Sequence, residues 1–313
     1  MSRPLMFQQE PWQAFELTIR CMQSRLLMRP GEECNRRVQG VIGRALELYG
    51  EHVHVYLGGS ESNHFHIVMA AESAEWKARF KSHIKTNISK ELGYLHDWRG
   101  CHWDRRCRDI PILDDEALCD RLMYLVAHGV KSGLSETPFH WPGVQWVRAV
   151  TEGKTLSGPW YDRTKLDAML RRWERLPAGE RGPKPGLGDV TTMKTIPLTP
   201  PPMWAHLDPE ELKARWRELV EEAQRRYPPH DRVLGAKALC AADPHTRPER
   251  TKRSPAPAVH TSSTALRKAW RKAYATFVDT YRGAMERLRA GLDVVDFPAE
   301  GCRPPWFFPA PAG

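Results

Sequence analysis

Hydrophobic and polar positions alternate along the first part of the chain in a way that predicts strands and helices in turn. Apolar residues at every second position from Phe15 to Cys21 predict a first strand. Apolar residues at helical spacing between residues 32 and 49 predict a helix that ends at Gly50. Residues 52–57 and 62–69 are β-favouring runs joined by a Gly-Gly-Ser turn, so we expect them to pair as antiparallel strands.

The pattern continues with a second helix, a fourth strand and a third helix. Ser73 precedes a helix whose apolar stripe recurs every four residues, through Trp76, Phe80, Ile84, Ile88 and Leu92. We interpret residues 98–112 as a strand. A third helix is expected to begin at the acidic residues 114–116, where the helix dipole favours negative charge, and to end between Gly129 and Gly133. This order predicts an α+β fold of ferredoxin-like (RRM-like) type, with an antiparallel sheet and helices on one face.

The character of the sequence changes after residue 150. We therefore expect a first domain over residues 1–150 and a basic, mainly α-helical extension over residues 151–313. Pro-rich linkers are predicted at about 177–204 and 243–260. The second of these is polar and basic, and it is either a disordered connector or an arm that becomes ordered on nucleic acid; we favour the arm.

Three helices are expected in the extension. The first is a short amphipathic helix over residues 163–176. The second starts with Asp208 as its N-cap and Pro209 in its first position, and it runs to about Arg226. A third, long helix follows the capping residues 261–264, and its apolar stripe is formed by Trp270, Tyr274, Phe277, Tyr281, Met285 and Leu288.

Composition narrows the class of protein. The chain has 313 residues, of which 41% are hydrophobic, and its 47 Lys and Arg against 38 Asp and Glu give a net charge of +9. This excess favours a polyanionic partner, nucleic acid before an anionic membrane. Because the sequence shows neither an apolar run long enough to span a membrane nor the apolar core of a signal peptide, we expect a cytoplasmic protein without a membrane partner.

The seven cysteines give no indication of a zinc ribbon or a disulfide framework, because none of them forms a C-x-x-C pair. A metal cluster of Cys101, Cys107 and Cys119 with His102 is conceivable. Free buried cysteines are the more ordinary interpretation, and we favour it.

His64 and His66 are the first candidate site. Alternate residues of a strand share a face, so these two imidazoles lie about 7 Å apart and can turn toward one divalent cation. Buried structural histidines are the alternative. His52 and His54 form a second pair of this kind, for which we favour a solvated or hydrogen-bonded sheet face.

A basic and aromatic segment is the second candidate site. Residues 98–112 interleave aromatic rings, which can stack on unpaired bases, with arginines, which neutralise phosphates. The arginines are Arg99, Arg105, Arg106 and Arg108. We predict a surface that binds single-stranded nucleic acid; a strand that merely packs its tryptophans is the alternative.

Two stretches of the chain together resemble a known family. Asn63-His64-Phe65-His66 is similar to the histidine strand of single-tyrosine HUH transposases of bacteria, specifically the REP-associated branch. Tyr124, followed by Val130-Lys131 and Gly133-Leu134, is similar to that family's tyrosine helix, and Trp141-Pro142 to the segment that follows it. The resemblance covers about residues 10–150.

The resemblance implies the HUH fold and a metal-dependent endonuclease and strand transferase. Tyr124 would attack single-stranded DNA with hairpin or palindromic ends and form a 5′-phosphotyrosine, with Mg²⁺ or Mn²⁺ held by His64 and His66. It also implies DNA contacts by Lys85 and Lys131, no small-molecule cofactor beyond the metal, and a monomer or a homodimer.

One departure from the family pattern concerns the third metal ligand. His128 and Gly129 stand where the family usually has Asn and Pro. Residues at i and i+4 are neighbours on a helix, so His128 can reach the metal near Tyr124, and a third imidazole favours softer ions such as Mn²⁺, Co²⁺ or Zn²⁺. A helix-end cation is the alternative role for His128.

Two other functions stay open. The chain is alternatively a domesticated or inactive relative that binds structured nucleic acid without cleaving it. A metal-dependent RNA phosphodiesterase or RNA-binding module is a third hypothesis, and dependence on the 2′-hydroxyl would identify it.

Overall fold

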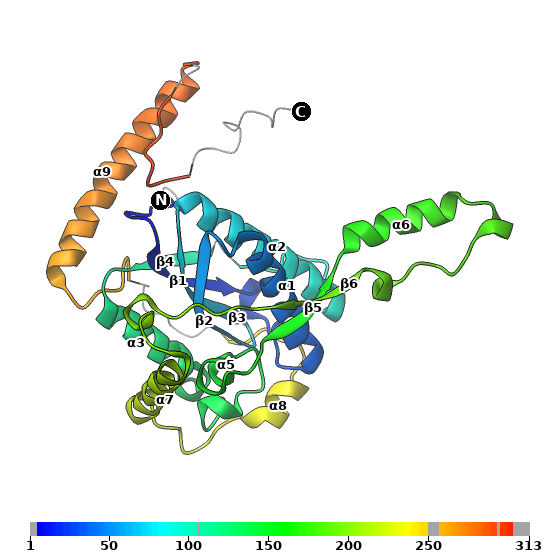
Figure 1. Cartoon of the computed structure of the whole chain (residues 1–313), viewed down its shortest axis with the longest axis horizontal. Coiled ribbons are helices and arrows are strands. Elements are labelled where there is room, and N and C mark those ends of the chain that lie inside the picture. The colour runs from blue at the N-terminus through cyan, green and yellow to red at the C-terminus, as the bar shows by residue number, and fades with distance from the viewer. Residues whose placement is uncertain (1–4, 105–106, 250–256, 293–294, 303–313) are drawn as a thin grey trace.

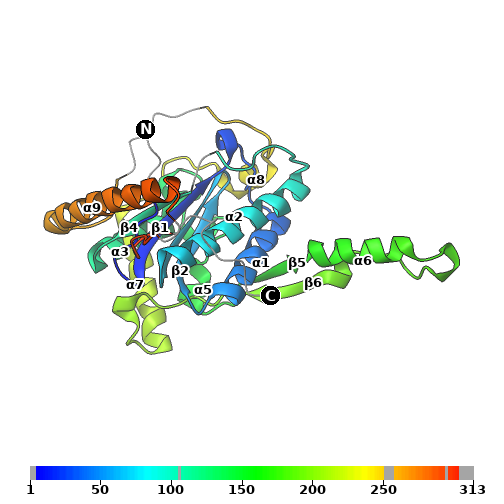
Figure 2. The same cartoon turned by 90° about the horizontal axis from the view of Figure 1, so that it is seen from above.

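The computed structural model describes residues 5–104, 107–249, 257–292 and 295–302 (Figures 1 and 2). At its centre lies a four-stranded sheet in the order β2-β3-β1-β4, and neighbouring strands pair antiparallel. The strands are β1 (Gln13–Arg20), β2 (Val53–Glu61), β3 (His64–Ala71) and β4 (Arg108–Ile112). With α1 (Glu32–Tyr49) between β1 and β2 and α2 (Ala74–His96) between β3 and β4, the predicted ferredoxin-like α+β fold is confirmed.

Helices cover both faces of this sheet. On one face, the Lys77 ammonium of α2 lies 3.3 Å from the centre of the Phe15 ring of β1. On the other face, Arg121 of α3 (Asp115–Val126) contacts Glu16, the next residue of β1. The pair α1 and α2 therefore occupies one face as predicted, and α3 lies against the opposite one. Because both faces are covered, all eight residues of β3 are buried.

The helix starts in this domain follow the predicted capping signals. The Trp76 amide donates to the Ser73 hydroxyl at 3.3 Å, and the Ala117 amide donates to the Asp114 carboxylate at 2.8 Å. The end of α3 differs from the prediction. The helix stops at Val126, and a separate short helix, α4 (His128–Lys131), follows Ala127.

The predicted strand over residues 98–112 is wrong for most of its length. Only Arg108–Ile112 form β4, while Trp103 makes a single bridge to Cys21 and the preceding residues are irregular. The Trp98 indole instead donates to the Cys101 carbonyl, and the Trp103 indole donates to the Lys85 carbonyl. These side-chain bonds favour a compact loop over an extended strand.

The extension begins with a projecting arm, seen at the right of Figure 1. It consists of β5 (Ser157–Tyr161), α6 (Arg163–Arg175) and β6 (Thr191–Thr195), with β5 and β6 paired antiparallel. The sequence predicted α6 but assigned the residues of β6 to a linker, which is wrong. The base of this arm packs on α1, where Gly40 and Gly158 bring the two backbones into direct contact.

The remaining helices are α5 (Val147–Glu152), α7 (Pro209–Arg226), α8 (Gly235–Ala241) and α9 (Thr264–Arg289). The predicted capping box of α7 is confirmed, because Asp208 accepts from the Glu211 amide and Glu211 accepts from the Asp208 amide. Short 3-10 helices cover Met22–Ser24, Pro138–His140, Ala178–Glu180, Leu187–Val190 and Pro202–Trp204.

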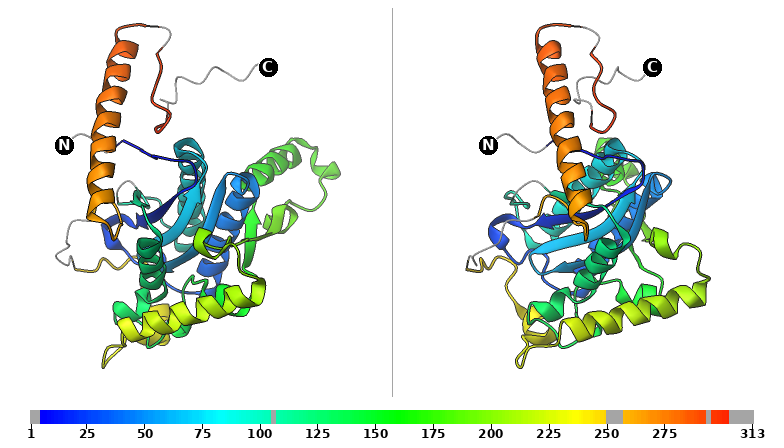
Figure 3. Two further views of the ribbon diagram at one scale, coloured as in Figure 1. Left: turned by 60° about the vertical axis from the view of Figure 1, so that its left-hand side comes forward. Right: turned by 90° about the vertical axis from the view of Figure 1, so that its left-hand side faces the viewer.

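The two parts of the sequence share one hydrophobic core. Trp216 and Leu219 of α7 belong to the same buried cluster as the sheet, and α5 runs across residue 150. The predicted domains over residues 1–150 and 151–313 were based on a change in sequence composition, and this division stays a prediction. A separate cluster joins α9 to the N-terminal segment, through Phe7, Trp270 and Phe277. Figure 3 shows α9 standing at one side of the molecule.

Some predictions concern parts of the chain outside the described residues. The basic linker is described up to residue 249 and again from residue 257, so its central residues are not covered. The Pro-rich end beyond residue 302 is not covered either. In the part of the chain that the structure describes, no helix is both long and apolar enough to cross a membrane.

Candidate metal centre and tyrosine site

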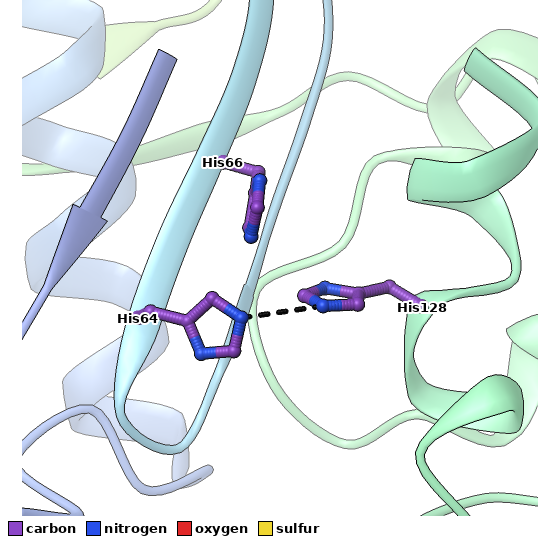
Figure 4. A group of neighbouring side chains, drawn as sticks. All are labelled: His64, His66 and His128. Carbon is purple, nitrogen blue, oxygen red and sulfur yellow. Dashed lines mark hydrogen bonds between the residues drawn. The ribbon is translucent and has the colours of Figure 1, made fainter. Parts of the chain in front are cut away.

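Three imidazoles converge between the sheet and the start of α4 (Figure 4). β3 directs His64 and His66 to the face that α3 covers, and His128 approaches from α4. The Nε2 atoms of His64 and His128 are 3.2 Å apart, and the ligand atoms of all three lie within 4.8 Å of one another. All three residues are buried. In the described ranges, this is the one group of three residues suited to hold a metal ion.

The neighbours of His66 determine which of its nitrogens carries the proton. Its Nδ1 lies 3.0 Å from a carboxylate oxygen of Glu16 and 3.1 Å from the Thr18 hydroxyl. An ionised carboxylate can only accept, so Nδ1–H is the donor and Nε2 presents its lone pair. That Nε2 is buried and has no hydrogen-bond partner. A buried nitrogen without a partner is costly, and a bound cation would satisfy it.

His64 is also prepared to act as a ligand, and His128 lies beside it. The Nδ1 atom of His64 lies 2.5 Å from the Asn63 side-chain oxygen, so it donates there and its Nε2 lone pair faces His128. Burial lowers the pKa of His128 well below its ordinary value, so this imidazole is neutral near pH 7.

The residues fit a divalent transition metal. Two ligand nitrogens that each bind one ion at about 2.1 Å are about 3 to 3.5 Å apart, and the His64–His128 pair already has this separation. The ligand atom of His66 lies within 4.8 Å of both. Three neutral imidazoles suit Mn²⁺, Co²⁺ or Zn²⁺ better than Mg²⁺, which prefers oxygen ligands.

Glu16 is a site residue that sequence reasoning missed. Burial alone would raise the pKa of its carboxyl, but contacts with His260 and His66 and the charge of Arg121 lower this pKa well below the usual range. The carboxylate is therefore ionised at neutral pH and serves as the acceptor for His66. No local signal marked it, because Glu16 and Arg20 are both charged positions that alternate with the apolar Phe15, Leu17 and Ile19 of β1.

Glu61 is a second missed residue. It closes β2, and its carboxylate lies 3.3 Å from His128 Nε2 and accepts from the Ser132 hydroxyl at 2.7 Å. Burial raises the pKa of Glu61 to about 7. A carboxylate at the edge of the imidazole group adds an oxygen to the donor set, which suits a cation in this position.

Tyr124 lies beside the imidazoles. Its ring centroid is 6.3 Å from that of His66 and 5.3 Å from that of His128. The Arg121 guanidinium lies 4.1 Å from the ring centre, and the Lys131 ammonium 4.6 Å from it. Burial, aided by the Glu16 and Glu61 charges and opposed by Arg121, raises the pKa of Tyr124. The phenol is therefore protonated at neutral pH and needs assistance before it can attack a substrate.

The predicted nucleic-acid contacts are spread over the molecule. Lys131 lies at the tyrosine, and exposed Arg108 pairs with Thr18 in the sheet, so it shares the face of His66. Lys85 belongs to α2 on the opposite face. Arg99 is exposed and pairs with Asp97 at 3.6 Å. Arg105 and Arg106 lie outside the described residues.

The alternative metal sites considered from the sequence do not form in the described residues. His52 contacts Glu72 at 2.5 Å and stacks on Trp76, while His54 stacks on Trp12. His52 therefore has the hydrogen-bonded role that we favoured, and His54 is half-buried against Trp12. All seven cysteines are free.

No protein-family model and no curated protein matches the chain. Among solved structures, it is similar to a REP-associated tyrosine transposase bound to a REP hairpin, with 13% identity over 49% of this chain and 86% of that one and a TM-score of 0.38. It is also similar to a Deinococcus radiodurans protein described as a transposase, with 9% identity over 40% of this chain and 95% of that one and a TM-score of 0.28. At such low scores, the basis for a functional conclusion is the geometry of the site itself.

Proposed function

We propose that this protein is a metal-dependent single-strand DNA endonuclease and strand transferase with Tyr124 as its nucleophile. The observation that supports the proposal is the convergence of Tyr124 with three imidazoles, of which His66 has a buried and unpartnered Nε2. The resemblance of the sequence around His64, His66 and Tyr124 to HUH transposases adds the substrate class, DNA with hairpin or palindromic ends.

His64, His66 and His128 would hold the cation, with Glu61 at the edge of the group. When bound, a divalent cation polarises the scissile phosphate and stabilises negative charge on its oxygens. The donor set favours Mn²⁺ over Mg²⁺. The net charge of +9 agrees with a polyanionic substrate.

In the proposed reaction, the energy of the cleaved phosphodiester bond is kept in the new bond to the tyrosine. The Tyr124 oxygen attacks the phosphorus and loses its proton, while the bond to the 3′ oxygen of the neighbouring nucleotide breaks and that oxygen gains a proton. A 5′-phosphotyrosine and a free 3′-hydroxyl result, and the reverse step can join a different 3′-hydroxyl without ATP. Arg121 and Lys131 flank the ring with positive charge, which offsets the charge that develops on the phenolic oxygen.

The decisive experiment uses labelled hairpin DNA with a single-stranded flank, in the presence of Mn²⁺. We expect a covalent protein–DNA adduct that survives denaturation, that is lost in Tyr124→Phe and His66→Ala, and that needs the metal. Tyr227→Phe is a matched control, because Tyr227 is also half-buried and contacts Lys131, whose ammonium lies 5.3 Å from its ring centre.

The same assay distinguishes the other hypotheses. An adduct in the wild type that persists in Tyr124→Phe would assign the nucleophile to another residue. Tight binding without an adduct on any oligonucleotide would indicate a binding protein without catalytic activity. Cleavage that requires a 2′-hydroxyl at the scissile position would indicate an RNA phosphodiesterase.

A further inference from the structure

The segment formed by residues 257–263, here called the docking segment, joins the extension to the edge of the sheet. The His260 amide donates to the Pro111 carbonyl at 2.8 Å, and the Leu113 amide donates to the His260 carbonyl at 3.0 Å. Ser262 donates its amide and hydroxyl to Asp114, the N-cap of α3. The docking segment is thus anchored both to the end of β4 and to the start of the helix that carries Tyr124.

This anchoring brings one side chain of the extension to the candidate metal centre. The Nε2 atom of His260 lies 2.8 Å from Glu16 Oε2, while Glu16 Oε1 faces His66. The side chains of Glu16 and His260 are only 8% and 11% exposed. His260 therefore contacts the carboxylate that fixes the tautomer of His66.

Glu16 Oε2 has a second neighbour, Arg121, which also contacts Tyr124. Arg121 lies 3.2 Å from this oxygen and also covers the Tyr124 ring. A buried carboxylate needs hydrogen-bond or ionic partners. Without His260, Arg121 alone would have to neutralise Glu16 Oε2. The Arg121 guanidinium would then move toward Glu16 and away from the Tyr124 ring, and the Glu16 carboxylate would hold His66 less firmly.

We propose that His260 is a positioning residue for the metal centre, acting through Glu16 on His66, so that the C-terminal extension completes a site whose ligands lie in the N-terminal part. The inference rests on the proposed function for the role of the metal. It assigns the extension a task in metal binding that is separate from any contact with DNA.

The test measures binding of Co²⁺ alone to the full chain after treatment with a chelator, by calorimetry and by the visible absorption of the bound ion. Outer-shell partners of metal ligands typically contribute about 10- to 100-fold in affinity, and we expect Glu16→Gln to weaken binding by about that factor. Because His260→Gln acts one step further away, we expect a loss of about 3- to 10-fold. In His260→Lys an ammonium group can donate to Glu16, so this variant should recover most of the Co²⁺ affinity that His260→Gln loses. His206→Gln, at an exposed position, is the control.

A second measurement needs no metal. In nitrogen-15 spectra of the histidine rings, wild-type His66 should show a protonated Nδ1 that exchanges slowly with water. His260→Gln should speed this exchange, while the melting temperature and far-UV circular dichroism report whether the fold is kept. If His260→Gln does not fold, His260→Lys and Glu16→Gln are measured in its place.

The outcomes separate the two proposals. Unchanged Co²⁺ affinity and unchanged His66 exchange in folded His260→Gln would overturn the role of His260. If the wild type binds no Co²⁺ or Mn²⁺, the proposed metal-dependent function fails, and the His66 exchange alone then decides whether His260 positions Glu16.

Discussion

At the scale of single residues, the candidate site depends on which ring nitrogen of His64 and of His66 carries the proton. His66 presents its Nε2 lone pair because Glu16 and Thr18 surround Nδ1, and His64 directs Nε2 to His128 because Asn63 accepts from Nδ1. The two histidines were predictable, since alternation along a strand places them on one face. Glu16 and His260 were not, because their contacts join residues far apart in the sequence and no local pattern links them.

Lys77 permits a prediction that is independent of the site. Its side chain is 1% exposed, and burial, opposed by Asp109, lowers its pKa from 10.5 to about 8. Between pH 8 and 10.5 the unfolded chain keeps the proton that the folded chain has lost, so this residue makes the free energy of unfolding rise with pH. The total rise is about 3 kcal/mol.

Replacement of Lys77 by methionine should therefore stabilise the protein at pH 7 by about 1 to 3 kcal/mol, because the volume is kept and Lys81 still pairs with Asp109. The difference from the wild type should shrink as the pH rises toward 10. Urea unfolding at several pH values measures it, with exposed Lys90→Met as the control. A variant that is less stable than the wild type at pH 7 would show that the contacts with Phe15 and Asp109 outweigh the cost of burial.

At the scale of elements, the break between α3 and α4 changes how His128 reaches the site. The sequence suggested one continuous helix, in which Tyr124 and His128 are one turn apart. The chain instead leaves helical geometry at Ala127, with ψ at 2°, and His128 begins α4. The rings still meet, because the Lys131 amide donates back to Ala127 and holds α4 against the end of α3.

The β5–β6 hairpin was missed for a physical reason. The threonines of β6 favour a strand, but the segment is largely exposed and follows a Pro- and Gly-rich stretch, so no buried apolar face indicates one. β6 forms because β5 offers it a partner, and β5 is fixed by its contact with α1. Pairing with a distant segment overrides the local signal here.

Gly40 is the residue on which this contact depends. A β-carbon at Gly40 would overlap the Pro159 carbonyl, and this backbone atom cannot move without shifting β5. Gly40→Ala should therefore lower the stability by about 1 to 3 kcal/mol, the usual cost of overpacking. Hydrogen exchange of the amides in residues 191–195 should also become faster. In Gly283→Ala the new methyl group meets no neighbour within 4 Å, so this variant should unfold like the wild type or slightly later.

Equal stability and unchanged exchange in Gly40→Ala would contradict the direct contact between α1 and β5. Loss of exchange protection throughout the chain, beyond residues 191–195, would mean that the hairpin and the central core unfold together.

At the scale of the whole molecule, the sheet carries helices on both faces, and its two faces have different tasks. The face under α1 and α2 is apolar core apart from Lys77 and Asp109. The face under α3 carries Glu16, His64 and His66, and the extension contributes to it from two sides, through α7 beside α3 and through the docking segment at β4. The ferredoxin-like core was predictable from periodicity, while the shared core and this closure depend on contacts that only the folded chain reveals.

The position of positive charge around this face leads to a prediction for DNA binding. Exposed Lys131 and Arg108 lie on the α3 side, and Lys85 lies on α2 across the sheet. Each phosphate contact with a single DNA strand contributes about −0.7 to the slope of log affinity against log salt. Lys131→Ala and Arg108→Ala should each reduce the slope by about that amount, because both are exposed cations on the face that carries Tyr124.

Binding of fluorescent hairpin DNA at several salt concentrations measures these slopes, and Lys90→Ala, on the exposed side of α2, serves as the control. Lys85→Ala distinguishes two paths for the DNA. An unchanged slope would confine the DNA to the α3 face, whereas a reduction like that of Lys131→Ala would mean that the DNA wraps around the β4 edge onto α2. If neither Lys131 nor Arg108 affects the slope while the wild type still depends strongly on salt, the phosphates bind elsewhere, and the basic residues of the projecting arm and of α9 become the surfaces to test, since both carry exposed Lys and Arg away from the core.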